Sequence, residues 1–295
     1  MRPIYKGFLL AVALLCASTL SIAQSPAPCN YTLFKYPGTT IIDTTARGIN
    51  RWGTIVGWAQ DQANGVWGFT RYADGSFKRF KVFGSGSTQF FRRNANGATV
   101  GFYVDGTNLH DHGLLLVGST LTTIDYPGAA NTVLTGINQW GTMVGYYIDS
   151  SGHYKGFKRW SNGSFQPVQF PNATDTMPMD INDSGIIVGS VGAGGPINVR
   201  GFVLANGKYT YVDDPFVAVG STVLTDINAS GMIVGESFDS NGTAKGFRLK
   251  NGTFENLIVP GSIESDASGI NDSGVIVGSA TISGAGNQSY IAQCQ

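Results

Sequence analysis

Histidine is the residue of this chain with the most clearly defined metal chemistry. His110 and His112 flank one aspartate, and His153 is the third histidine of the chain. Alternate side chains of an extended strand share a face, so the first two imidazoles would lie together. Imidazole and a nearby carboxylate such as Asp105 suit a transition metal. The alternative is ordinary loops, because the equivalent segment 149–152 is typical of a turn. These four residues are a candidate divalent-metal site, and we expect no other cofactor.

Aromatic side chains give a second candidate site. Trp52 and Trp140 occupy the same position of two glycine-containing turns, where small residues stand in three other repeats. Exposed tryptophans often mark a contact surface and can stack on sugars or on partner side chains. Trp58 and Tyr146 each follow a Val-Gly pair, and the matching positions of the last three repeats are polar: Ser190, Glu236 and Ser279. The alternative is that these rings only fill space between repeats.

Charged residues near a recurring asparagine could line a central channel. They are not present in every repeat, and glycine occupies one of these columns at Gly48, Gly136 and Gly269. No set of nucleophile, base and acid can be assembled from the spacing. The charged positions are Arg47, Arg92, Asp180, Asp226 and Asp266.

An internal repeat must position all of these residues. An asparagine, usually preceded by Ile, recurs every 43 to 46 residues, with Gly three residues later and a Val-Gly pair after that. Repeats of this length are typical of propellers and solenoids. The recurring asparagines are Asn50, Asn94, Asn138, Asn182, Asn228 and Asn271.

Each repeat contains four short segments with strand composition. In the third repeat they are 132–137, 142–148, 155–160 and 165–170. Asparagine and glycine at the first joint favour a type I turn, and Asn-Gly or Asp-Gly at the last joint favours a two-residue hairpin. No segment has the 3.6-residue apolar period of a helix. The sequence therefore predicts an all-β, six-bladed β-propeller with four antiparallel strands per blade.

The ends of the chain predict how the ring closes. A strand at 33–37 has the character of the fourth strand of a blade, and the last repeat lacks that strand. We therefore expect the N-terminal strand to complete the last blade. Cys29 and Cys294 would then flank the missing turn and form a disulfide, which constrains the unfolded chain by roughly 4–5 kcal/mol. The mature protein should carry no free thiol under non-reducing conditions.

The first 23 residues resemble a secretory signal. Arg2 and Lys6 precede an apolar run at 8–15, and small residues end at Ala23, where we expect cleavage. The predicted mature domain is 24–295, with no further apolar stretch long enough to span a membrane. With 17 basic and 19 acidic residues left, it is a poor nucleic-acid binder. We expect a monomer located outside the cell or in a periplasm.

The repeat resembles the extracellular family called HAF repeats, in its Gly/Asp-Ile-Asn, Val-Gly, Gly-Phe and Pro-Gly elements. The resemblance covers nearly the whole mature chain and implies a secreted or surface-associated bacterial protein, but it implies no catalytic residues. The second repeat departs from the pattern, with Arg92-Arg93 before its asparagine and Gly113-Leu114 in place of Gly-Phe.

The predicted function is that of a secreted, non-enzymatic binding or scaffold propeller. Its ligand would be a glycan or an extracellular protein, bound through Trp52, Trp140, Trp58 and Tyr146. The alternative is a metal-dependent hydrolase or lactonase of the six-bladed propeller type.

Overall fold

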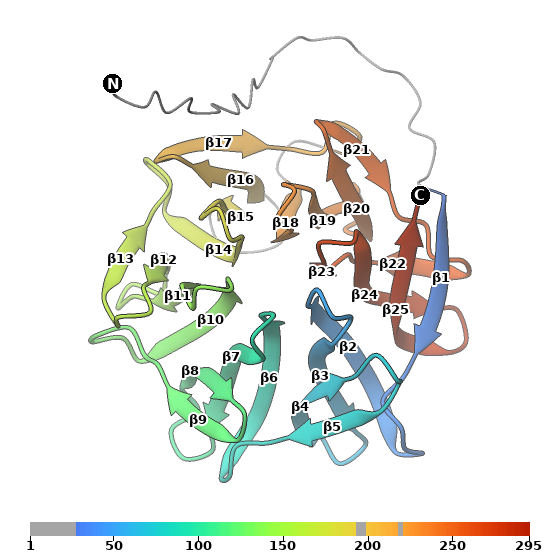
Figure 1. The fold of residues 1–295 in the computed structure, drawn as a ribbon, viewed down its shortest axis with the longest axis horizontal. Helices are drawn as coiled ribbons and strands as arrows, with labels where there is room; N and C mark the ends of the chain where they lie inside the picture. Colours follow the sequence, from blue (N-terminus) through green and yellow to red (C-terminus); the bar gives the residue numbers. More distant parts are fainter. Residues whose placement is uncertain (1–27, 193–198, 218–220) are drawn as a thin grey trace, which may run out of the picture.

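The chain forms six antiparallel β-sheets arranged as blades around a central axis (Figure 1). A computed structural model describes residues 28–192, 199–217 and 221–295. The predicted signal sequence lies outside the described residues. The prediction of an all-β, six-bladed propeller is confirmed, and the N-terminal strand pairs with the last blade as expected.

The strands run outward from the axis in chain order within the first five blades, and in the last blade β1 lies outside β25. The first three blades contain β2 (Ile41–Ile49), β3 (Ile55–Asp61), β4 (Val66–Arg71) and β5 (Phe77–Phe80); β6 (Ser85–Arg93), β7 (Ala98–Asp105), β8 (Asp111–Val117) and β9 (Thr120–Thr123); and β10 (Asn131–Ile137), β11 (Met143–Ile148), β12 (Tyr154–Arg159) and β13 (Phe165–Val168). The last three contain β14 (Asp175–Ile181), β15 (Ile187–Gly192), β16 (Val199–Ala205) and β17 (Lys208–Val212); β18 (Thr222–Ile227), β19 (Ile233–Phe238), β20 (Ala244–Lys250) and β21 (Thr253–Asn256); and β22 (Ser262–Ser265), β23 (Gly269–Ile270), β24 (Val275–Ile282), β25 (Gly286–Cys294) and β1 (Cys29–Phe34).

The repeated apolar residues form the core between blades. Val144 and Phe157 of the third blade are both fully buried. The equivalent valines and the equivalent aromatic or leucine residues of the other five blades are fully buried as well. Burial of a large side chain of this kind stabilises the fold by roughly 1.5–3 kcal/mol, so the repetition of the same contacts explains the repetition in the sequence.

Two glycines of each repeat allow different close contacts. A Cβ on Gly145 would lie 2.1 Å from the carbonyl oxygen of Val133 in the same blade. The glycine of the Val-Gly pair therefore allows a close contact between two strands of one sheet, and not between neighbouring sheets. A Cβ on Gly156 would lie 2.6 Å from Pro178 of the next blade, so the glycine of Gly-Phe is the one that lets the blades pack together.

The turns between third and fourth strands are of two kinds. In blades four and five, both central residues have positive φ, as the hairpin prediction required: Asn206 and Gly207, Asn251 and Gly252. In blade three, only Gly163 has a positive φ, and the Asn162 carboxamide accepts a hydrogen bond from the Ser164 amide at 3.0 Å. The two-residue hairpin prediction is wrong there, because Trp160 pairs with Ser164 and the loop at 161–163 has one extra residue before the Asn-Gly pair.

The recurring asparagines form a closed ring of hydrogen bonds. The Asn138 side chain accepts the amides of Trp140 and Thr142, which fixes its own turn. Its Nδ2 group donates to the backbone oxygen of Asn182 in the next blade. The same donation is repeated by all six asparagines, and the last one, from Asn271 to the backbone oxygen of Asn50, closes the ring.

Replacing Asn138 by Asp should separate these two roles. Asp keeps the acceptor that fixes the turn but places an oxygen against the Asn182 carbonyl, so we expect a loss of about 1–3 kcal/mol in the free energy of unfolding. Asn138→Ala removes both roles and should cost more. Asn162→Asp is the matched control, since Asp74 already fills that role in blade one by accepting the Ser76 amide. Urea unfolding followed by tryptophan fluorescence measures all three, and an Asn138→Asp loss equal to the control would contradict the bridging role.

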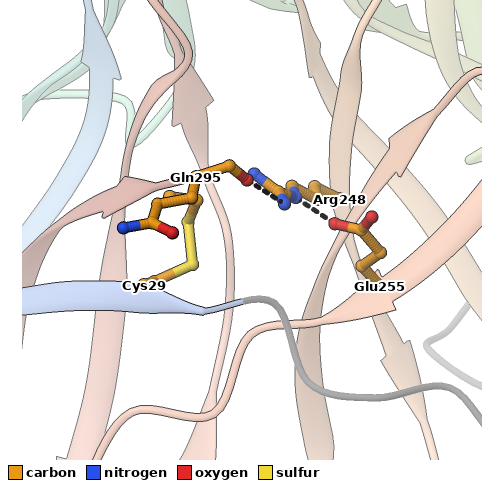
Figure 2. Close-up of a disulfide and its surroundings, with 5 residues drawn as sticks. Cys29, Arg248, Glu255 and Gln295 are labelled. Atoms are coloured by element: carbon orange, nitrogen blue, oxygen red, sulfur yellow. Dashed lines mark hydrogen bonds and ion pairs between the residues drawn. A yellow bond between two sulfur atoms is a disulfide. The ribbon is translucent and has the colours of Figure 1, made fainter.

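The ring is closed covalently as well as by strand pairing. β1 pairs with β25 with Cys29 opposite Cys294, and these residues form a disulfide across 265 residues of sequence. Beside it lies the Arg248 guanidinium of the fifth blade, which donates to the Gln295 backbone oxygen and pairs with Glu255 of its own blade (Figure 2). The predicted disulfide is confirmed. The predicted bounds of 33–37 are wrong, because the strand begins and ends earlier, at Cys29 and Phe34.

Candidate functional site

The inner strand of every blade is interrupted shortly before its asparagine. In blade three the pairing of β10 with β11 shifts between Leu134 and Gly136, so Thr135 is left as a bulge. β2, β6, β14 and β18 shift at the same place, and in the last blade the inner strand is broken between β22 and β23. A bulge turns a side chain away from the regular pattern. The residues at the interruptions all line one central cavity: Arg47, Phe91, Thr135, Met179, Thr225 and Ser268.

Arg92 reaches across the channel to groups of other blades. Its guanidinium donates to the backbone oxygens of Arg47, Phe91 and Thr225, which belong to three different blades. The Nε atom also lies 3.5 Å from Asp226 and 3.6 Å from Asp180. One side chain therefore connects four blades and separates the cavity from the opposite mouth of the channel.

The two carboxylates beside Arg92 have different surroundings. Burial, and then the neighbouring Asp226 carboxylate, raise the pKa of Asp180 well above its ordinary value. Asp226 accepts hydrogen bonds from the amides of Ile227 and Ile270 and lies 3.5 Å from the Arg92 Nε atom. Arg92 therefore faces one carboxylate that backbone amides hold in place and one whose neutral form is favoured by burial.

Three glycines provide the space for these three charged side chains. Gly48, Gly136 and Gly269 stand two residues before the recurring asparagine in their repeats, which is the position that Arg92, Asp180 and Asp226 occupy in the other three. A Cβ on Gly136 would lie 2.6 Å from an Asp180 carboxylate oxygen, and a Cβ on Gly48 would lie 2.5 Å from the Phe91 backbone oxygen. Glycine in three repeats therefore leaves room in the channel for the charged side chains of the other three repeats.

The cavity has a volume of about 380 Å³ and lies on the side of Arg92 where second strands lead into third strands. Tyr154 begins β12 and Phe238 ends β19, and both line the wall. Tyr146 contacts Tyr154 edge to face, with ring centroids 5.4 Å apart. The polar part of the wall contains Ser190, Glu236 and Ser268 together with Arg47.

Two groups in the cavity wall have shifted acidities. Burial, followed by the Asp266 carboxylate, raises the pKa of Glu236 to about 7, while Arg47 opposes the shift. Burial raises the pKa of Tyr146 to about 12, so its hydroxyl stays protonated. Near neutral pH Glu236 can therefore donate or accept a hydrogen bond, and it could act as a general acid or base.

The four predicted ligand-binding aromatics do not form one surface. Tyr146 lines the cavity. Trp52 and Trp140 are each 66% exposed on the turns at the other end of the inner strands, where their Nε1 groups donate to backbone oxygens of the next blade's turn. Trp58 is half-buried, its Nε1 has no hydrogen-bond partner, and it is not among the cavity-lining residues.

Two of the histidines are paired with carboxylates, and the His153 pair joins the third blade to Asp175 at the start of the fourth. His112 Nδ1 lies 2.8 Å from Asp125, and the ring stacks on Tyr103. His153 Nδ1 lies 3.3 Å from Asp175. These pairs explain both side chains without a metal ion.

Asp105 is engaged in a turn. It accepts hydrogen bonds from the amide and hydroxyl of Thr107 at 2.7 Å and 2.6 Å, which lowers its pKa. Within 28–192, 199–217 and 221–295, no three or more His, Cys, Asp or Glu side chains gather closely enough to hold a metal ion. The structure therefore does not bring the four predicted metal ligands together in one site: His110, His112, His153 and Asp105. Metal binding stays a prediction, which a metal titration would test.

The described part of the chain contains no helix with the length and hydrophobicity needed to cross a bilayer. This is the structural observation that bears on the prediction of no membrane span.

Comparison with known proteins supports the fold alone. No protein family and no curated protein matches the chain. The lectin of Aleuria aurantia, solved with Fucα1-6GlcNAc, superposes with a TM-score of 0.51 at 13% identity, covering 85% of this chain and 91% of the lectin. AofleA of Arthrobotrys oligospora, as a triple arginine-to-alanine mutant, gives 0.53 at 11% identity, covering 89% and 86%. A gluconolactonase of Xanthomonas campestris gives 0.53 at 12% identity, covering 92% and 97%.

Proposed function

We propose that this protein is an exported, non-enzymatic propeller that binds a glycan in the central cavity. The observation that carries the proposal is the make-up of the cavity wall, in which the rings of Phe91, Tyr146, Tyr154 and Phe238 lie together with hydroxyl and carboxyl groups. Aromatic faces can stack on the apolar faces of sugars, while a few placed polar groups fix orientation.

Two further observations support this proposal. The fold is shared with a lectin that was solved with a fucosylated saccharide. The disulfide of Cys29 with Cys294 is of the kind that persists in oxidising compartments, which agrees with export. The exposed face of Trp52 and Trp140 is where a protein partner would bind instead.

A glycan array with the purified protein tests the proposal. We expect Tyr146→Ala to weaken binding of any array hit by about 10-fold or more, because one aromatic contact contributes about 1–3 kcal/mol. Trp140→Ala is the matched comparison, since it removes a ring from the other end of the channel. Binding lost in the Trp140 variant and kept in the Tyr146 variant would move the site to the turn face.

A hydrolase or lactonase is the second candidate, and Glu236 is the observation that favours it. Its pKa of about 7 suits a general base, and a gluconolactonase shares the fold. An esterase and lactonase panel separates the two candidates. Turnover that is abolished by Glu236→Gln would favour the enzyme, and turnover abolished by a chelator would favour its metal-dependent form.

A further inference from the structure

Arg47 is a cation of the cavity wall that has no ionic partner in the described residues. Its guanidinium lies over the Phe91 ring, with 5.6 Å between the Cζ atom and the ring centroid, and its Nε atom is buried without a hydrogen bond. Arg92, Arg200 and Arg248 each face a carboxylate. A half-buried guanidinium whose Nε atom has no hydrogen-bond partner can bind an anion through charge-assisted hydrogen bonds, so this wall favours an anionic ligand.

Some polar side chains of the cavity already have hydrogen-bond partners within the protein, and the others are free to bind a ligand. The hydroxyls of Thr135 and Thr225 already donate to backbone oxygens of the next blade. Arg92 lies beside Asp226, as described above. The Ser268 hydroxyl is likewise engaged, because it donates to the Asp266 carboxylate at 2.6 Å. This leaves a set of groups that can meet a ligand: Arg47, Tyr146, Ser190 and Glu236.

The size of the cavity limits the ligand. Its volume of about 380 Å³ lies near the lower end of the range of about 300–1,000 Å³ for small-molecule sites. A single sugar unit with one charged substituent fits that size better than a long chain does.

We propose that the glycan bound in the cavity is an acidic saccharide, whose carboxylate pairs with Arg47 while the Glu236 side chain forms a hydrogen bond with the same ligand. This inference rests on the proposed function and adds the chemical class of the sugar. The planar guanidinium matches a carboxylate through two parallel hydrogen bonds, which an ammonium group cannot reproduce.

Glu236 makes this binding sensitive to pH. In the free protein burial and the Asp266 carboxylate hold its pKa at about 7. A bound anion adds negative charge nearby, so binding should be accompanied by proton uptake at Glu236. The titratable and charged groups around it are Asp266 and Glu264 in the last blade, Arg47 on β2, and, within the same cavity, Arg92, Tyr146 and Tyr154.

Isothermal titration with glucuronate, galacturonate and N-acetylneuraminate, beside neutral glucose and galactose, tests the inference. We expect the protein to bind at least one acidic sugar and to bind its neutral counterpart more weakly. Affinity should be about 10-fold higher at pH 6 than at pH 8, because Glu236 changes from mostly protonated to mostly charged across its pKa of about 7. Titrations in two buffers with different ionisation enthalpies should show proton uptake.

Three variants make the outcomes distinguishable. Arg47→Met should weaken acidic-sugar binding about 10–100-fold, Arg47→Lys should recover part of it, and Glu236→Gln should abolish the pH dependence. Arg51→Met, on an exposed turn outside the cavity, should change nothing, and urea unfolding checks that each variant is folded. Equal binding of neutral and acidic sugars would overturn this inference and leave the proposed function in place. No binding of any sugar would overturn both.

Discussion

Replacing Arg92 by methionine is expected to lower the free energy of unfolding by about 3–5 kcal/mol, as breaking a buried ion pair does. The variant keeps a side chain of similar length but removes five N–H donors. It leaves three backbone oxygens without their donor and leaves the Asp226 carboxylate without its cation. Urea unfolding of the wild type and the variant, followed by tryptophan fluorescence, measures the loss.

Two further variants test the cause of that loss. Arg51→Met removes an arginine from an exposed turn of the same channel mouth and should change stability by less than about 0.5 kcal/mol. Adding Asp226→Asn to Arg92→Met should recover part of the loss, because the uncompensated charge is then gone. A loss below about 1 kcal/mol for Arg92→Met would show that Arg92 does not join the blades.

Removing the disulfide by Cys29→Ser with Cys294→Ser is expected to cost about 4–5 kcal/mol, because the closed loop is very long. The strand pairing of β1 with β25 remains in the variant, so the ring should still form at low denaturant concentration. Differential scanning calorimetry and urea unfolding both report the change.

Reduction of the wild type provides the control for this prediction. A reductant should lower wild-type stability to that of the double variant and should leave the variant unchanged. A thiol assay of the untreated, unfolded mature protein should find no free thiol. A double variant as stable as the oxidised wild type would contradict the role of the disulfide.

The sequence predicted the repeating part of the fold well because each repeat makes the same contacts. Val144 and Phe157 could be assigned to the core, since residues of the same kind recur at fixed spacing and all of them are buried. The disulfide followed from the same alignment of repeats, which placed Cys29 and Cys294 on either side of one missing turn.

The candidate site could be predicted only in part. Tyr146 was identified because the residue after the Val-Gly pair is aromatic in the early repeats and polar in the last three, and it lines the cavity. Arg47 and Arg92 were recognised as channel residues, but their different roles were not. Arg47 is the bulged residue of β2 and lines the cavity, whereas Arg92 follows the bulge of β6 and crosses the axis. A bulge changes strand pairing without a signature in composition, so the spacing alone could not reveal it.

Only one of the two roles of the recurring asparagines could be predicted from the sequence. The spacing of the asparagines was evident, and the turn that each of them fixes was predicted correctly. The bond from Asn138 to the next blade joins residues 44 positions apart, and it depends on how two sheets are placed. The type of a side chain does not reveal how two sheets are placed relative to each other. The hydrogen bond to the next blade could therefore be found only in the structure.

The pairing of β1 with β25 also determines how soon the ring can close, because these strands are synthesised first and last. The two cysteines are separated by 265 residues, and at roughly 5–20 residues per second the ribosome needs on the order of ten seconds to a minute to supply the missing edge. Until the last strand is made, β1 lacks its pairing partner and the sixth blade lacks its two outer strands. Closure of the ring is therefore the last strand pairing that becomes available to the chain.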